Sequence, residues 1–288
     1  WGLSYSELQT LRPDIIMASL SGFGISGPQK DYLSYATVIE GMSGITTLNG
    51  FPGGHPYAAG VYFPDFFMGN YGVLSIVAAL IHRDFTGKGQ FIDVSQLQST
   101  ATLFPEMVLD WEVTQRERVP QGNVIEGAAP AGVFRCKGAD RWAAITIETD
   151  SEWRSLCEAL GETDQAQNKR FATALDRWTH RDQLNVWLQE RVKEYDPMEL
   201  FHLLQQHGIN AAPSADVLDL INDPHVQARG LLREVDHPVT KSGLAINAPW
   251  KLSDTPSSIT KSGPLIGEDT DSIVGDLLGM NKKDISLL

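Results

Sequence analysis

The segment from Asp65 to Arg83 constrains the fold of this chain more than any other part of the sequence. Its apolar residues recur at the three- and four-residue spacing of an α-helix, and they spread widely enough to be covered on most sides. Because 42% of the 288 residues are apolar, the chain is long and apolar enough to build a packed core. The sequence therefore predicts a long helix packed into a domain. The apolar positions are Phe66, Met68, Val73, Ile76, Val77, Leu80 and Ile81.

Two apolar runs flank this helix and are typical of strands. The run from Asp14 to Leu20 resembles a buried strand of a parallel sheet, and a second strand is predicted over 91–94. Ser95 would cap a helix that runs towards Trp111, and a short helix is expected around Val38. These elements favour an α/β fold for the first part of the chain.

A smaller domain is expected to begin where the chain becomes polar and contains glycine, from Pro120 to Pro130. The predicted domain limits are 1–120, 121–215 and 216–288. The elements expected after this polar stretch are a hairpin of 132–136 and 142–147, helices over 151–160, 181–192 and 197–207, and a terminal helix over 269–278.

Charge and composition narrow the classes of partner. Lys and Arg total 23 against 36 Asp and Glu, and the net charge of -13 disfavours nucleic acids and anionic membranes. The longest apolar run, Val73–Ile81, is shorter than the roughly 20 residues of a membrane-spanning helix, so none is expected. Neither a signal peptide nor a disulfide between Cys136 and Cys157 is expected, which favours the cytoplasm.

A glycine motif follows the first predicted strand. Gly22, Gly24 and Gly27 match G-x-G-x-x-G, a pattern of dinucleotide-binding turns. The residues after it, 29–32, show no apolar face, so the helix that should receive a pyrophosphate is missing. We therefore favour a loop that lets the backbone approach another group closely.

Asp65 is the most informative acidic residue, because it follows Pro64 at the start of the long predicted helix. It can be the N-cap of that helix, or a carboxylate nucleophile or base kept ionised by the helix dipole. Spacing alone does not choose between these roles. The seven histidines form no metal-binding pair, and no G-x-S-x-G motif is present, so neither a metal site nor a serine hydrolase is expected.

Several segments in order along the chain resemble the class III coenzyme A transferases. This family includes the formyl-CoA and carnitine CoA-transferases and also the α-methylacyl-CoA racemases. The resemblance covers nearly all of the 288 residues. The segments that carry it most clearly are 11–14, 21–28, 60–65 and 83–90.

The resemblance implies an incomplete Rossmann-like large domain, a smaller inserted α+β domain, and a dimer of interlocked rings. It places the catalytic nucleophile on Asp65, which would form a mixed anhydride with the acyl donor and then an aspartyl-CoA thioester. CoA would move in this way from an acyl-CoA to a free carboxylic acid, with the thioester as substrate and no separate cofactor. The relatives carry an N-terminal half of the Rossmann-like domain before the position of Trp1, so we expect a homodimer or a heteromer in which another chain supplies that half.

The resemblance also marks neighbours of the substrate. The segment Leu33, Ser34, Tyr35 and Ala36 falls where the family contacts CoA. A flap over the reacting centre aligns with Glu126, Gly127 and Ala128.

Two alternatives to a transferase stay open. Racemases of this fold carry a His where this chain has Tyr35, and a phenol is a poor base at neutral pH, which favours a transferase over a 2-methylacyl-CoA racemase. The chain can also be a non-catalytic partner subunit of a CoA-transferase.

Overall fold

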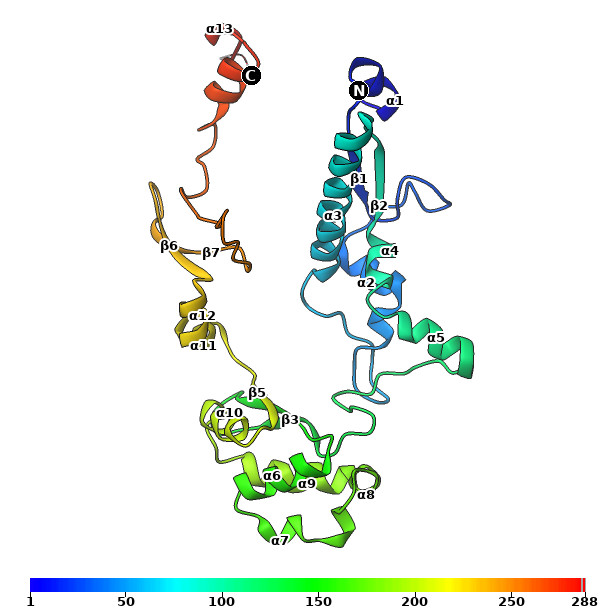
Figure 1. Ribbon diagram of the computed structural model, residues 1–288, viewed down its shortest axis with the longest axis vertical. Coiled ribbons are helices and arrows are strands. Elements are labelled where there is room, and N and C mark those ends of the chain that lie inside the picture. Colours follow the sequence, from blue (N-terminus) through cyan, green and yellow to red (C-terminus); the bar gives the residue numbers. More distant parts are fainter. Residues whose placement is uncertain (286, 288) are drawn as a thin grey trace.

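The computed structural model describes residues 1–285 and 287, and Figure 1 shows three successive parts of the chain. The N-terminal part and the C-terminal part stand apart, and the middle part joins them. The N-terminal part contains α1 (Tyr5–Leu11), β1 (Met17–Ser21), α2 (Ala36–Ser43), a 3-10 turn (Ile45–Thr47), α3 (Phe63–Thr86), β2 (Phe91–Ser95), α4 (Gln96–Ala101) and α5 (Pro105–Thr114). The middle part contains β3 (Ala131–Arg135), β4 (Trp142–Thr146), α6 (Asp150–Ala159), α7 (Thr163–Ala166), a 3-10 turn (Lys169–Phe171), α8 (Ala174–Thr179), α9 (Arg181–Val192), α10 (Pro197–Gln206) and β5 (Asn210–Pro213). The C-terminal part contains α11 (Val217–Asn222), α12 (Pro224–Arg229), β6 (Leu232–His237), β7 (Lys241–Ile246), a π-helical segment (Asp271–Leu277) and α13 (Lys282–Ile285).

The two strands of the N-terminal part are parallel, as the sequence predicts. β1 pairs with β2 in a register that runs from Met17 opposite Phe91 to Ser21 opposite Ser95. Parallel neighbours need a long crossover, and α3 lies in that connection and packs against both strands. The structure is thus a mixed α/β fold with small sheets, while the Rossmann-like domain, the interlocked dimer and the domain limits stay predictions.

The long predicted helix is present as α3, which extends a few residues beyond the predicted limits at both ends. It ends at Gly87, whose φ of +69° suits a glycine at a helix C-terminus. The expected burial on most sides is wrong for the described residues, because only Pro64, Gly72 and Ala79 of this helix are buried. The neighbours β1, β2, α2 and α4 cover one side of α3 and leave much of its apolar surface exposed.

By length and composition, α3 could cross a membrane. It has 24 residues, and an 18-residue stretch within it has a mean hydropathy of 1.4, so the expectation that no segment is long enough is wrong. The count of apolar residues missed it because polar residues such as Asn70 and His82 lie on either side of the run Val73–Ile81. The core helix of a globular domain has the same length and composition, so this property alone does not place α3 in a bilayer.

Two other predicted helices differ from the structure. The helix expected after Ser95 splits into α4 and α5, because α5 begins anew at Pro105, which lacks the N–H that a helix interior requires. The expected terminal helix is a π-helical segment.

The hairpin of β6 and β7 was not predicted from the sequence. The strands of this hairpin are largely exposed, so they lack the clear apolar alternation of a half-buried strand.

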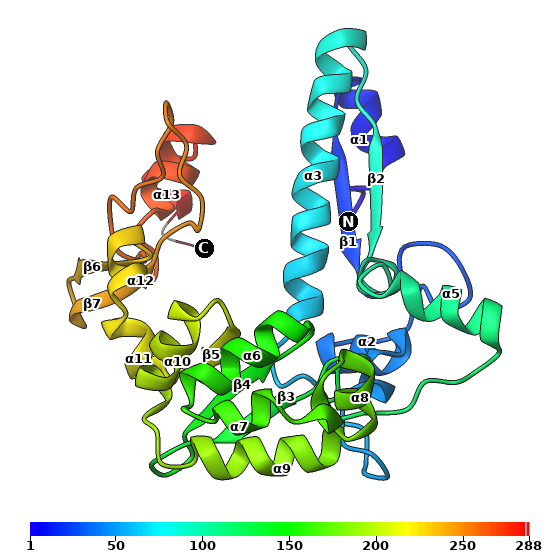
Figure 2. The same cartoon turned by 60° about the horizontal axis from the view of Figure 1, so that its bottom comes forward.

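The middle part holds the packed core of the described residues. Its antiparallel sheet has the order β3-β4-β5, and Figure 2 shows α6, α8, α9 and α10 gathered near these strands. The predicted hairpin and helices of this part are confirmed, and both cysteines are buried free thiols. The core residues are Ala129, Phe134, Cys136, Ala143, Ile145, Ile147, Trp153, Leu156, Cys157, Phe171, Leu184, Leu188, Val192, Leu200, Leu204, Ile209 and Ala211.

Candidate active site

The carboxyl ends of β1 and β2 lie at one edge of the parallel pair, where Ser21 is opposite Ser95. The chain leaves β1 through the glycine motif and leaves β2 directly into α4. Ser95 caps α4 as predicted, because its hydroxyl accepts a hydrogen bond from the N–H of Gln98 at 3.3 Å. In open α/β sheets, ligands bind at this kind of edge.

Asp65 and Gln96 are joined at this edge. Asp65 is the third residue of α3, whose N-cap is Tyr62, so the interpretation of Asp65 as the N-cap is wrong. Oδ1 of Asp65 accepts a hydrogen bond from Nε2 of Gln96, the first residue of α4. Gln96 is buried, whereas Asp65 is exposed. The bond therefore links the starts of two helices and fixes one oxygen of the carboxylate.

The glycine loop packs tightly against the same helix start. The carbonyl of Gly22 accepts a hydrogen bond from the N–H of Leu97 at 2.9 Å. A Cβ on Gly22 would lie 1.8 Å from Oγ of Ser34, so the position has no room for a side chain. The N–H of Ile25 donates to both carboxylate oxygens of Asp93 at 3.2 Å and is not free for a phosphate. These contacts support the close-approach interpretation over a dinucleotide-binding turn.

The segment expected to contact CoA reaches this edge through Ser34. Ser34 is half-buried beside Gly22, and Ala36 is buried at the start of α2. Leu33 and Tyr35 are 93% and 82% exposed, so their side chains are open to a ligand. Since Gly22 also contacts the residue after Gln96, the structure brings this segment and Asp65 to the same edge.

Two residues of this region were not expected from the sequence. Glu40 of α2 is buried, and its Oε2 accepts a hydrogen bond from the N–H of Ala59 at 3.1 Å, which holds the loop before α3. An acid within the apolar residues of α2 was the signal for it. Gln96 could have been found because it follows a predicted strand at the edge where ligands bind.

The residues of the expected flap lie in the linker between α5 and β3. The N–H of Ala128 bonds the carbonyl of Ile125 at 3.1 Å, and the turn between them requires a φ of +84° at Gly127, which suits a glycine. Glu126 and Gly127 are exposed, and Ala128 is buried. Across residues 1–285 and 287, no hydrogen bond or ion pair given by the structure joins this flap to Asp65.

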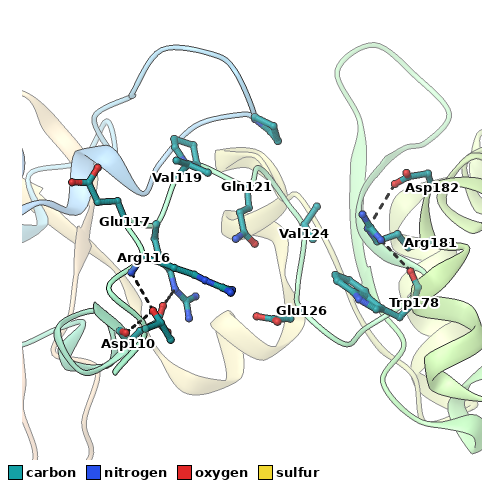
Figure 3. Close-up of a pocket in the computed structure, with 14 residues that line it drawn as sticks. Asp110, Arg116, Glu117, Val119, Gln121, Val124, Glu126, Trp178, Arg181 and Asp182 are labelled. Atoms are coloured by element: carbon teal, nitrogen blue, oxygen red, sulfur yellow. Dashed lines mark hydrogen bonds and ion pairs between the residues drawn. The ribbon is translucent and has the colours of Figure 1, made fainter. Parts of the chain in front are cut away.

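Glu126 instead lines a pocket of about 630 Å³ between the linker and the start of α9 (Figure 3). Two pairs of side chains line this pocket. Nε of Arg118 lies 2.7 Å from Oδ2 of Asp110, and Cζ of Arg181 lies 4.6 Å from the ring centroid of Trp178. Asp65 is not among the residues that line it. Of the three expected flap residues, Glu126 thus lines a pocket of mixed charge whose lining does not include Asp65.

No metal centre is found in the part of the chain that the structure describes. No group of three or more His, Cys, Asp or Glu side chains there is arranged to hold an ion.

The chain is similar to known proteins over nearly its whole length. The family model for CoA-transferase family III matches residues 1–270. The chain is 28% identical over its whole length to succinyl-CoA–D-citramalate CoA-transferase of Chloroflexus aurantiacus and covers 71% of that protein. It is 30% identical to the beta subunit of succinyl-CoA–L-malate CoA-transferase from the same organism, over 99% of this chain and 71% of the relative.

A solved structure shares the fold. The crystal structure of a CAIB/BAIF family protein from Brucella suis superposes with a TM-score of 0.86 at 30% identity, over 96% of this chain and 71% of that one. A match across residues 1–270, together with this similarity over nearly the whole chain, places the protein in CoA-transferase family III.

Proposed function

We propose that this protein transfers CoA from an acyl-CoA to a free carboxylic acid, with Asp65 as the nucleophile. The observation that carries the proposal is the hydrogen bond between Gln96 and Asp65 at the carboxyl edge of the parallel strands. One carboxylate oxygen is held, and the other has no such bond among the described residues. The expected CoA-contacting segment lies at the same edge.

The reaction balances without any proton transfer. Oδ2 of Asp65 attacks the donor thioester, a C–O bond forms, the C–S bond breaks, and CoA thiolate leaves with the electron pair. The thiolate then attacks Cγ of Asp65, which forms an aspartyl-CoA thioester and releases the donor acid as its carboxylate. The acceptor carboxylate displaces the thiolate from Cγ, and the thiolate then attacks the acceptor's acyl carbon and regenerates Asp65.

The position of Asp65 suits this chemistry electrically. It lies in the first turn of α3, near the positive end of the helix dipole. Its exposure is less suitable, because acyl transfer of this kind needs water to be excluded. We therefore propose that a further chain segment or a second subunit covers this edge in the working enzyme. The relative succinyl-CoA–L-malate CoA-transferase is named as a beta subunit, which agrees with such an assembly.

Succinyl-CoA is the first donor to test, because the names of both curated relatives contain it. Short dicarboxylic acids are the first acceptors for the same reason. The decisive experiment incubates the intact protein with succinyl-CoA and each acid, quenches with hydroxylamine, and analyses the peptide that contains Asp65 by mass spectrometry. We expect CoA transfer and modification of Asp65.

The matched variants are D65N and D84N, since Asp84 is an exposed acid near the other end of the same helix. D65N should abolish transfer and modification, and D84N should leave both unchanged. Full transfer by D65N contradicts the proposal. Exchange of the α-proton of a 2-methylacyl-CoA without transfer would assign a racemase instead.

A further inference from the structure

Gln96 is a buried amide whose hydrogen-bond donor faces an exposed acid. It is 5% exposed, and its Nε2 donates to Oδ1 of Asp65. An ionised carboxylate can only accept hydrogen bonds, so the amide must present its NH₂ group to Asp65. A buried polar group is costly to leave unpaired, which makes this orientation strongly preferred.

The backbone holds Gln96 firmly in place. Gln96 is the first residue of α4 and directly follows β2. Its carbonyl accepts hydrogen bonds from the hydroxyls of Ser99 at 3.0 Å and Thr100 at 2.8 Å. The donor is therefore preorganised before any substrate arrives, which is the property that lets a hydrogen bond lower a reaction barrier.

Oδ1 is also the atom on which negative charge develops. When the CoA thiolate attacks Cγ of the anhydride, the C–S bond forms, and the electron pair of the carbonyl moves onto Oδ1. The pair then returns, and the bond to the donor carboxylate breaks. The same charge forms again when the acceptor attacks the aspartyl-CoA thioester. By contrast, the first attack on the donor thioester places its charge on the donor's own carbonyl oxygen.

We propose that Gln96 is a catalytic residue, whose Nε2–H stabilises the oxyanion that forms on Oδ1 of Asp65 at both attacks on Cγ. The inference rests on the proposed function of Asp65 and assigns the donor for one of the two kinds of attack. It follows that loss of the amide slows the two attacks on Cγ and spares the step that forms the first anhydride.

The test compares Q96M with Q98M in the intact protein, with succinyl-CoA and succinate isotope exchange as the probe. Met has nearly the size of Gln and donates no hydrogen bond, and Gln98 is an exposed Gln on the same helix. Q96M should lower kcat about 100-fold or more, the loss typical of one oxyanion donor, with a small change in KM. The anhydride should accumulate on Asp65 and appear as an acyl adduct, while Q98M should match the wild type.

Q96E separates hydrogen-bond donation from packing. Two neighbouring carboxylates hold one proton more tightly than a lone acid does, and the protonated group can donate to Oδ1. Activity of Q96E should therefore recover as the pH falls towards 5, whereas Q96M should stay slow at every pH. The elements packed against α4 carry other titratable groups, which are the same in all variants and do not account for this difference. These groups are Glu40, Tyr71, His82, Arg83, Asp84 and Asp93.

The outcomes are distinct. If the wild type shows neither transfer nor an adduct on Asp65, the proposed function itself fails. If the wild type forms the adduct and Q96M retains kcat within about threefold, or if Q98M is equally slow, the role of Gln96 is overturned. A Q96E variant that stays as slow as Q96M at low pH assigns Gln96 to packing and likewise overturns it.

Discussion

The middle and N-terminal parts of this protein bury their apolar side chains very differently. In the middle part, Leu156 of α6 and Leu188 of α9 are fully buried between helices and the three-stranded sheet. In the N-terminal part, Val73 and Leu74 of α3 are 64% and 65% exposed, although α3 is the most apolar long helix of the chain. The middle part therefore has a closed apolar core, whereas the Asp65 edge lies in a part that leaves much apolar surface exposed.

The largest expected effect on stability comes from replacing a buried tryptophan, with an exposed tryptophan as the control. Trp153 is 1% exposed and lies against Trp187 with ring centroids 5.4 Å apart, and Trp111 of α5 is 52% exposed. W153A should lower the free energy of unfolding of the middle part by about 3–5 kcal/mol, because it leaves a large cavity. W111A should lower the free energy of unfolding by about 0.5 kcal/mol.

Urea denaturation followed by circular dichroism measures both values. An equal loss in the two variants would break the comparison, since it would mean that the N-terminal part has a core as closed as that of the middle part.

A smaller effect is expected from the buried Arg177. Its guanidinium donates to the carbonyls of Ala129 at 3.1 Å and Phe171 at 3.3 Å, and to Asp150 at 2.9 Å. R177M keeps the apolar stem but leaves buried carbonyls without a hydrogen-bond donor. It should therefore lower the free energy of unfolding by about 2–3 kcal/mol. R181M is the control, because Arg181 is partly exposed and bonds one carbonyl.

Thermal unfolding of the two variants provides the measurement. Because Ala129 follows the expected flap directly, amide exchange at 126–129 should also rise in R177M. Unchanged stability and exchange in R177M would show that Arg177 does not secure the middle part.

The smallest effect is a pH dependence confined to the middle part, which holds both cysteines. Burial raises the pKa of Cys157 from 9.0 to about 12. Above pH 9 the unfolded thiol loses its proton while the folded thiol keeps it, so stability falls as the pH rises, by about 1.4 kcal/mol per pH unit at most.

Urea midpoints of the wild type and C157A between pH 8 and 10.5 test this prediction. The difference between the two proteins should shrink as the pH rises above 9, since only the wild type carries the thiol. A constant difference would contradict it. Slow reaction of Cys157 with a thiol reagent below pH 9 would agree with its burial in the closed core.

Local patterns predicted much of the fold. The Ser95 cap and the hairpin of 132–136 and 142–147 both depend on neighbours within a few positions, and both are present. The break at Pro105 could have been predicted from the same local chemistry. The exposure of α3 could not, because periodicity records which face is apolar and not what covers that face.

For the candidate site, the sequence marked Asp65 by its place at the start of the long predicted helix, and the resemblance placed the expected nucleophile there and the expected CoA contacts at residues 33–36. Only the tertiary structure decided that Gln96, 31 residues further along the chain, faces the carboxylate, and that Glu126 of the expected flap lines another pocket. The physical reason is the distance along the chain over which each interaction acts. Propensities and caps act over one helical turn, whereas the partner of a side chain is set by strands and helices that meet in space after folding.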